Sequence, residues 1–475
     1  MAATVVRAAL LERQFRLLSR RSNVGTEVRA GLTTFMVMAY IIVLNAVIIT
    51  AGAKIAGQNV PFPAVVTSTC LVAGIMCLAM GLYANLPFAM APGMGLNAVV
   101  AFQLMVGMKY TFAEAMGVIV LEGLIITVLV LTGLRQLILR ALPFSLKLAI
   151  GAGIGLFLFA IGAYEGGLFT VPPYVPIDGG GTRPPDTAGT LGNFLAPATL
   201  FALFGLVLTA ALMRARIKGA LLIGILLTTL VGMIVHLVLR VPLSTVPGKL
   251  ELPSPLVSGP DFSLLGAVFN GGFAFLLSGT GPAILAGLLA TLSVMLSDFF
   301  DTAGTFTALG TEAELVDKEG NLRENEDRAY LVDSLGALFG GLCGCSSATT
   351  YIESGAGIAE GGRTGLTSVV TAIPFLLAMW LGGLFSIVPP EATAGALMIV
   401  GLLMLAATAA EIPWRDFSVG LPALFALMIM PLTWSITNGI GAGVILYTLL
   451  HVRTAGIPLW VVSLVFVVYF ALGSH

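Results

Sequence analysis

Long apolar stretches recur along the whole chain and constrain its fold more than any other feature. A helix needs about 20 apolar residues to cross a bilayer, and fourteen transmembrane segments are predicted on that basis. The continuous ones cover about 31–50, 63–82, 111–133, 144–163, 192–212, 218–239, 283–309, 329–342, 366–388, 393–410, 417–450 and 457–473. With 57% hydrophobic and only 10% charged residues among its 475, the chain is predicted to be an all-α polytopic membrane protein.

Two of these regions leave alternatives open. The stretch 262–309 carries no charge before Asp298 and is too long for one span. We expect 262–279 to be an interfacial or re-entrant helix that precedes the span 283–309, although two full spans would also fit and would invert everything downstream. The stretch 417–450 is either one long span bent around Pro431 or two shorter helices.

Segments 3 and 10 are broken. Residues 85–97 read N-L-P-F-A-M-A-P-G-M-G-L-N, and residues 343–363 read C-G-C-S-S-A-T-T-Y-I-E-S-G-A-G-I-A-E-G-G-R. Pro and Gly interrupt a regular helix, and irregular backbone at membrane depth survives only where protein or water covers it. Each break is third in a half of seven segments. Matching breaks in two halves point to a transporter site, and an odd number of segments per half makes the repeats inverted.

The breaks and segment 8 carry the candidate functional side chains. Asp298, Asp301 and Thr305 are spaced i, i+3 and i+7, which predicts one shared helix face; the alternative is that the aspartates meet water at the cytoplasmic end. Glu353 is costly at membrane depth, and its alternative role is to cap a half-helix. Asn97 offers both a donor and an acceptor, or else it caps the helix after Gly95.

Other polar residues support fewer conclusions. Glu122 in segment 4 is a further candidate, Glu114 is expected at the membrane edge, and Asp333 is expected to pair with polar groups inside the bundle. The hydroxyl groups near the second break are expected mainly to satisfy freed backbone groups: Ser346, Ser347, Thr349, Thr350 and Ser354. Cys70, Cys77, Cys343 and Cys345 have the spacing of neither a disulfide framework nor a zinc site.

The chain has no motif for ATP-driven pumping or hydrolysis, so no enzyme activity, cofactor or catalytic residue is expected. A net charge of −1 gives no reason to expect nucleic acid as a partner. The tail 1–29 is basic, which places it in the cytoplasm under the positive-inside rule. With fourteen segments, both termini are predicted to be cytoplasmic. The basic residues outside are then Lys54, Lys109, Arg183, Arg240, Lys249 and Arg453, a minority of the 23.

Four motifs resemble one family of transporters. They are T-E-V-R-A-G-L-T-T-F-M-V-M-A-Y-I-I-V-L-N (26–45), A-P-G-M-G-L-N-A (91–98), D-F-F-D-T-A-G-T (298–305) and T-T-Y-I-E-S-G-A-G-I-A-E-G-G-R-T-G-L-T-S (349–368). Through them the chain resembles the nucleobase–cation symporter (nucleobase–ascorbate transporter) family, and within it the branch of azaguanine-type adenine/guanine/hypoxanthine permeases. The resemblance runs through nearly the whole chain in one order.

The resemblance implies a division into two domains. A core domain would comprise 30–134 and 262–390, and a gate domain 135–261 and 391–475, the latter often a dimer contact. It also implies a site at which D-T-A-G-T selects Asp301 over Asp298, with Thr305 one turn later.

In the same way, Glu353 and Asn97 occupy the family's polar positions in segments 10 and 3. Ser354 is a further candidate contact, and Phe88 or Tyr351 a candidate stacking partner.

The implied function is import of purine bases (guanine, hypoxanthine, adenine) across the cell (inner) membrane. The expected mechanism is proton symport with alternating access. Asp301, Glu353 and Asp298 are the candidate carriers of the coupled proton. An anion exchanger of the same architecture is the alternative, although paired carboxylates argue against it. A membrane-embedded enzyme would need a nucleophile or metal cluster that the sequence does not show.

Overall fold

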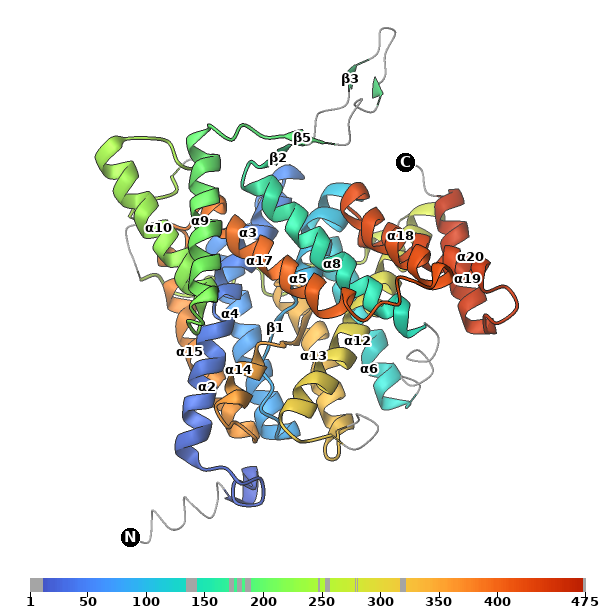
Figure 1. The fold of residues 1–475 in the computed structure, drawn as a ribbon, viewed down its shortest axis with the longest axis horizontal. Coiled ribbons are helices and arrows are strands. Elements are labelled where there is room, and N and C mark those ends of the chain that lie inside the picture. Colours follow the sequence, from blue (N-terminus) through green and yellow to red (C-terminus); the bar gives the residue numbers. More distant parts are fainter. Residues whose placement is uncertain are drawn as a thin grey trace.

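The computed structural model describes residues 12–133, 143–170, 175–176, 182–183, 189–246, 248–252, 257–277, 279, 281–316 and 322–472. These residues form a bundle of helices with a few very short strands (Figure 1). Among them, nine helices are long and apolar enough to cross a membrane, and five shorter apolar helical stretches accompany these. The predicted helical, polytopic fold is therefore confirmed. Residues 1–11 of the basic tail and the stretches 171–174, 177–181 and 184–188 of the loop 164–191 lie outside the described part.

The first half contains two π-helical stretches, η1 and η2, and two pairs of two-residue strands in the loop before α9. Its helices are α2 (Val24–Met38), α3 (Tyr40–Ile55), α4 (Phe62–Ala79), η1 (Met80–Ala84), α5 (Met94–Ala98), η2 (Val99–Gly107), α6 (Phe112–Leu131), α8 (Phe144–Glu165), α9 (Pro197–Arg214) and α10 (Ala220–Leu239). Its strands are β1 (Met90–Pro92), β2 (Phe169–Thr170), β3 (Val175–Pro176), β4 (Thr182–Arg183) and β5 (Thr190–Leu191).

The second half is built in the same style, with a single strand between its helices. Its helices are η3 (Ala267–Phe269), α11 (Ala274–Leu277), α12 (Gly281–Glu312), α13 (Glu326–Cys343), α14 (Ser354–Ala359), α15 (Gly365–Ala378), η4 (Met379–Leu381), α16 (Gly382–Phe385), α17 (Pro390–Ala409), α18 (Phe417–Thr433), α19 (Ile436–Leu450) and α20 (Ile457–Leu472). Its strand is β6 (Ala348–Thr350).

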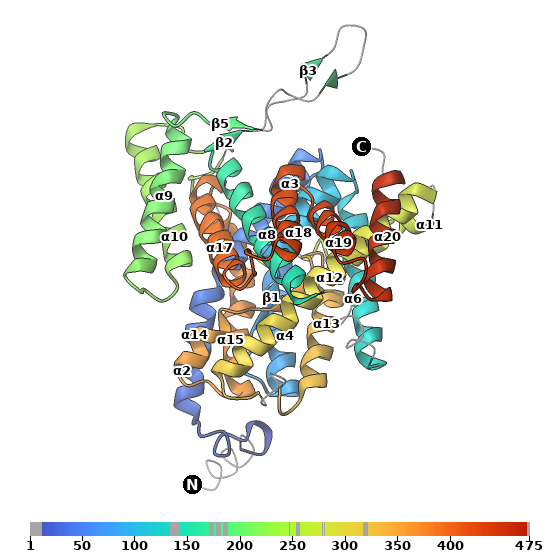
Figure 2. The ribbon, with the colours of Figure 1, turned by 45° about the vertical axis from the view of Figure 1, so that its right-hand side comes forward.

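The packing of the helices interleaves the two halves of the chain. In the first group, α6 packs against α13, α4 against α15, and α2 against α14 and α15. In the second group, α8 packs against α17 and α18, and α9 against α10 and α17. Figures 1 and 2 show the second group at the upper part of the molecule and α2, α14 and α15 reaching the lower end. Each group thus takes helices from both halves.

The region before α12 shows which alternative for 262–309 is correct. A single continuous helix, α12, covers the second part, so the one-span alternative is confirmed. The stretch 262–279 is not the single helix that was predicted, because only the 3-10 turn η3 and the four-residue helix α11 form there. Gly266 and Gly271 adopt φ angles of 72° and 86°, and such left-handed backbone ends a helix.

The stretch 417–450 folds as two packed helices, α18 and α19, rather than one bent span. Between them Trp434 takes a left-handed φ of 52°, and the Ser435 hydroxyl caps α19 by accepting the Asn438 N–H at 3.2 Å. This hairpin adds one reversal of chain direction. In both views α20 ends near the end of the molecule opposite to the N-terminal segment (Figures 1 and 2). The location of both termini in the cytoplasm stays a prediction.

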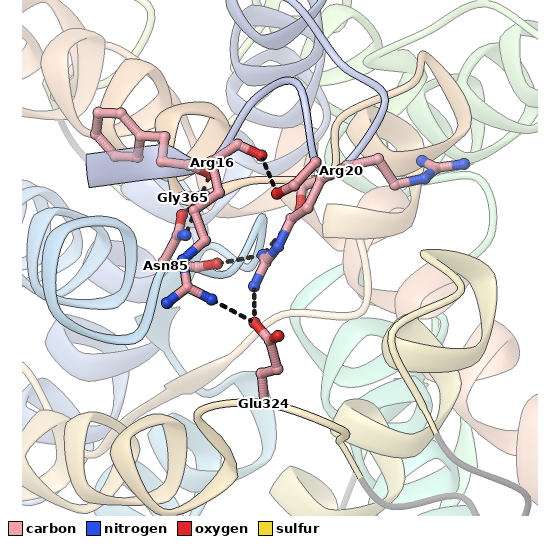
Figure 3. Close-up of polar contacts among 8 residues, drawn as sticks. Arg16, Arg20, Asn85, Glu324 and Gly365 are labelled. Atoms are coloured by element: carbon pink, nitrogen blue, oxygen red, sulfur yellow. Dashed lines mark hydrogen bonds and ion pairs between the residues drawn. The ribbon is translucent and has the colours of Figure 1, made fainter. Parts of the chain in front are cut away.

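The N-terminal segment is fastened to the core by a polar network (Figure 3). The Arg20 guanidinium donates to the backbone oxygen of Asn85 at 2.6 Å and pairs with Glu324 at 3.4 Å. Arg16 reaches the same Glu324 oxygen at 3.3 Å. Asn85 has a left-handed φ of 51°, and its side chain accepts the Gly365 N–H at 2.8 Å. The network joins the end of η1, the start of α15 and the loop before α13.

Candidate functional site

The two broken segments meet in the interior as a short antiparallel ladder. Strands β1 and β6 pair with Met90 opposite Thr350, and the ladder continues where Gly93 donates its N–H to the Ser347 oxygen at 2.8 Å. Each strand is followed by a short helix, α5 or α14. The same order of strand and helix running in opposite directions is what inverted repeats produce. The predicted extended pieces are confirmed.

Glu353 lies at the junction between β6 and α14. It occupies the cap position of α14, but its carboxylate makes no capping hydrogen bond, so the capping alternative is wrong. Instead, the Tyr40 hydroxyl donates to Glu353 Oε1 at 2.5 Å. Tyr40 is completely buried and is the first residue of α3, directly after Ala39, which separates α2 from α3. This contact fixes the direction of a half-buried carboxylate at the start of a short helix.

Asp298, Asp301 and Thr305 of α12 differ in their exposure. Asp298 and Thr305 are 1% and 7% exposed and face the packed interior, whereas Asp301 lies on an exposed face. Because α12 is one continuous helix, the spacing places the three residues within about 60° of one another, with Asp298 and Thr305 buried and Asp301 at the exposed edge of that face. The exposed face of α12 continues through Gly304, Ala308, Thr311 and Glu312. Carboxylates on this face indicate water rather than lipid beside it.

Asp333 of α13 has the polar partners that the sequence could not identify. Its Oδ1 accepts the backbone N–H of Thr350 at 3.0 Å and the Thr350 hydroxyl at 2.8 Å. Its Oδ2 accepts the Thr302 hydroxyl at 2.6 Å, and that hydroxyl also lies 2.9 Å from Thr349 Oγ1. One buried carboxylate thus joins α13, β6 and α12 and holds the second break in place.

A further carboxyl pair is buried beside this ladder. Glu122 of α6 and Asp298 of α12 are 0% and 1% exposed, and their carboxyl groups are within hydrogen-bonding reach of one another. The Ser347 hydroxyl lies 3.4 Å from Glu122 Oε1 and 3.4 Å from Asp298 Oδ2. The sequence marked Glu122 and Asp298 as separate candidates. Their juxtaposition could not be seen, because no spacing in the sequence relates segment 4 to segment 8.

Asn97 is completely buried within α5, and its side-chain oxygen has no hydrogen-bond partner. Gly93, not Gly95, precedes the helix, so the alternative of Asn97 as an N-cap is wrong. Its amide nitrogen lies 3.4 Å from the Pro92 oxygen, a long contact, and Oδ1 accepts no hydrogen bond. An amide oxygen without a donor in the interior leaves unused capacity to bind a ligand or a water molecule.

The remaining candidates fasten the ladder. The Ser354 hydroxyl accepts the Ala89 N–H at 2.9 Å and donates to the Tyr351 oxygen at 2.7 Å. The Tyr351 hydroxyl donates to the Pro92 oxygen at 2.5 Å. Phe88 is completely buried, with its ring 5.6 Å from that of Phe306. In this structure these side chains hold the backbone and pack the interior, and neither aromatic ring presents an open face.

The arrangement places two carboxylates, Asp301 and Glu353, near enough to interact electrostatically beside an open helix face. Carboxylates accept hydrogen bonds, so they suit a ligand that carries N–H groups. Within the described residues no group of His, Cys, Asp and Glu side chains is arranged to hold a metal ion. Tyr40 is the functional candidate that sequence reasoning missed, although it lies inside the motif 26–45.

Sequence comparison finds similar proteins along nearly the full length of the chain. The model of the xanthine/uracil permeases, described as "Permease family", matches residues 25–442. A putative permease of Methanocaldococcus jannaschii is 38% identical over 94% of this chain and 93% of its own. The adenine permease AdeQ of Escherichia coli is 36% identical over 94% and 91%. The guanine/hypoxanthine permease PbuG of Bacillus subtilis is 37% identical over 89% of both.

Solved structures with a similar fold come from other transporters. The transmembrane domain of the cyanobacterial bicarbonate transporter BicA superposes with a TM-score of 0.59 at 16% identity, covering 89% of this chain and 97% of that one. The anion transporter SLC26A9 gives 0.57 at 12% identity, covering 96% and 70%. At such low identity the likeness shows the fold alone, which is two inverted repeats of seven segments.

Proposed function

The chain belongs to the xanthine/uracil permease family, and we propose that it imports purine nucleobases, namely guanine, hypoxanthine and adenine, across the cell (inner) membrane. It is a multi-pass membrane protein of a family of permeases. The substrate class is supported by relatives that are more than a third identical, namely an adenine permease and a guanine/hypoxanthine permease.

The observation that carries the proposal is the pair Asp301 and Glu353 beside the open face of α12. Purine bases present ring N–H groups and, in adenine and guanine, an exocyclic amine. Two carboxylates can accept these donors, and Asn97 Oδ1 is free to accept another. Hydrogen bonds to a charged group contribute about 1.5–3 kcal/mol each. Thr305 lies one turn after Asp301 in α12, and the proposal includes a contact between Thr305 and the base.

An anion exchanger is the alternative that the shared fold suggests. A bicarbonate or sulfate ion at this position would face two carboxylates, and like charges at close range repel strongly in a poorly hydrated site. Within the described residues, the ion pairs join Arg16 and Arg20 to Glu324 and Lys218 to Glu360, none of them at the ladder. The electrostatics favour a neutral base over an anion.

The remaining elements of the mechanism belong to the same proposal. The coupling ion is a proton, and the core domain (30–134 and 262–390) moves against the gate domain (135–261 and 391–475) to give alternating access. The N-terminal tail is cytoplasmic, and two copies associate through the gate domain. Helices α8, α9, α10, α17 and α18 support this division, because they pack mainly among themselves.

Uptake of radiolabelled guanine, hypoxanthine and adenine by cells that lack their own purine carriers tests the proposal. The wild type is expected to accumulate at least one base, and a protonophore is expected to abolish accumulation. Asp301→Asn and Glu353→Gln are expected to bind the base about 10- to 100-fold more weakly, from the loss of one charged hydrogen bond each.

Glu165→Gln is the matched control, because Glu165 ends α8 and its buried oxygens have no hydrogen-bond partner. No uptake of any base by a protein that is present in the membrane would contradict the proposal. Uptake of bicarbonate or sulfate instead would establish the alternative.

A further inference from the structure

The carboxyl pair of Glu122 and Asp298 is buried without compensating charge. The two groups come from α6 and α12, are 0% and 1% exposed, and share the single hydroxyl of Ser347. One oxygen of each carboxyl, Glu122 Oε2 and Asp298 Oδ1, has no hydrogen-bond partner. Two carboxylates at hydrogen-bonding distance cannot both stay ionised in a dry interior, so such a pair holds a proton between them.

The titratable groups around the pair are also acidic. Asp333 of α13 and Asp301 of α12 are the other carboxyl groups that act on it. Asp333 already accepts three hydrogen bonds, whereas Asp301 is exposed. Among the described residues no Lys, Arg or His forms an ion pair with Glu122 or Asp298. A proton is therefore the counter-charge that this part of the interior can supply.

The pair is connected directly to the ladder that forms the candidate site. Ser347 offers its hydroxyl to the pair, and its backbone oxygen accepts the N–H of Gly93, the residue that precedes α5. Asp298 also lies about one helical turn from Asp301 on α12, but it is buried whereas Asp301 is exposed. A change in the number of protons on the pair would thus alter the hydrogen bonding of Ser347, which joins both broken segments, and the electrostatic environment of Asp301.

We propose that the Glu122–Asp298 pair is the site that carries the symported proton, and that Glu122 is a coupling residue of this transporter. This inference depends on the proposed purine transport. In one transport cycle the pair takes up one proton from the side on which the base binds and releases it on the other side with the base. Asp301 and Glu353 then serve chiefly to bind the base, and Ser347 links the two functions.

Purified wild-type protein and Glu122→Gln in liposomes that enclose a pH-sensitive dye test the proposal. In the wild type, external guanine is expected to acidify the lumen, and an imposed pH gradient is expected to drive guanine accumulation. In Glu122→Gln both signals are expected to fall at least tenfold, while guanine counterflow, which needs no net proton movement, continues. Glu165→Gln, a neutralised buried carboxylate in α8, is the matched control and is expected to keep both signals.

Two further variants cover the case in which Glu122→Gln does not fold. Asp298→Asn removes the other member of the pair and is expected to lose acidification in the same way. Ser347→Ala removes the shared donor to the anionic form, so half-maximal uptake is expected at a higher pH. Wild-type acidification in Glu122→Gln or Asp298→Asn would overturn the inference, as would an equal loss in Glu165→Gln.

Failure of the proposed function is distinguishable from failure of this inference. If the chain does not transport purines, the wild type itself will show no guanine counterflow. If purine transport is correct but the proton assignment is wrong, the wild type will exchange guanine while the variants keep wild-type acidification. Guanine accumulation that requires sodium and acidifies nothing would overturn the proton assignment and leave purine transport standing.

Discussion

Removal of the Asp333 carboxylate tests whether this residue anchors the second broken segment. In Asp333→Ala three donors lose their acceptor: the Thr350 N–H, the Thr350 hydroxyl and the Thr302 hydroxyl. The Thr302 hydroxyl can turn to Thr349 Oγ1, which is 2.9 Å away, but among the described residues the two Thr350 donors have no other acceptor. A buried donor left without a partner costs about 1–3 kcal/mol. The expected loss of unfolding free energy is therefore roughly 2–6 kcal/mol.

Asp333→Asn separates the role of the acceptor from that of the charge. Its amide oxygen can still accept both Thr350 donors, so less than half of the loss is expected. The assay is the apparent melting temperature of purified protein in one detergent, with guanine binding measured on the same samples. Asp333→Ala is expected to lower the melting temperature by several degrees and to weaken binding. Wild-type stability of Asp333→Ala, or equal damage in both variants, would refute the anchoring role.

Three further perturbations have outcomes that follow from single contacts. Tyr40→Phe removes the hydroxyl that holds Glu353, so calorimetry should show about 10- to 100-fold weaker purine binding; unchanged affinity would contradict the contact's role. Gly340→Ala would place a methyl group against the backbone just before β6 and should lower the melting temperature, whereas Gly304→Ala meets nothing within 4 Å and should not. Burial lowers the pKa of Lys249, in the loop 248–252, from 10.5 to about 8. The unfolded chain then binds more protons between these values, so wild-type stability should rise with pH from about 8 to 10.5, and Lys249→Met should lack that rise.

Much of the fold could be predicted because it follows from local physical chemistry. Apolar length identifies the spans, and Pro and Gly identify the breaks at 85–97 and 343–363. The sequence T-F-A-E at the start of α6 likewise has the pattern of a capping box, which Thr111 and Glu114 form. At 417–450 the sequence left two alternatives open, also for a local reason. The two helices there turn at Trp434 in a left-handed conformation, which a bulky aromatic residue gives no reason to expect.

The site was less predictable, because its contacts join residues that lie far apart in the chain. Asp301 and Glu353 could be named, but their surroundings could not. Tyr40 is 313 positions from Glu353, and Ser347 is 225 positions from Glu122. Apolar periodicity also fails to predict which residues of α12 are buried. The buried side of α12 includes polar residues such as Asp298 and Thr302, and its exposed side carries Asp301. These groups come together only in the packed fold, where α6, α12 and α13 pack around the β1–β6 ladder.

One end of the site is closed by hydrogen bonds and the other is exposed, and this difference bears on coupling. At one end, Gln103 of η2 accepts the backbone N–H groups of Ile436 at 3.0 Å and Thr437 at 3.3 Å, and it donates to the Thr437 hydroxyl. This contact closes segment 3 against α19. On the other side, the face of α12 is exposed from Asp301 to Glu312, toward the loop held by the N-terminal segment.

Asp301 is thus accessible to water, while the Glu122–Asp298 pair one turn away is buried. A carboxylate in water can exchange protons freely with one compartment. A dry pair cannot, so under the proposed mechanism its protonation changes only with the movement of the core. Coupling requires that difference, since a proton site open to solvent in every state would dissipate the gradient that it is meant to use.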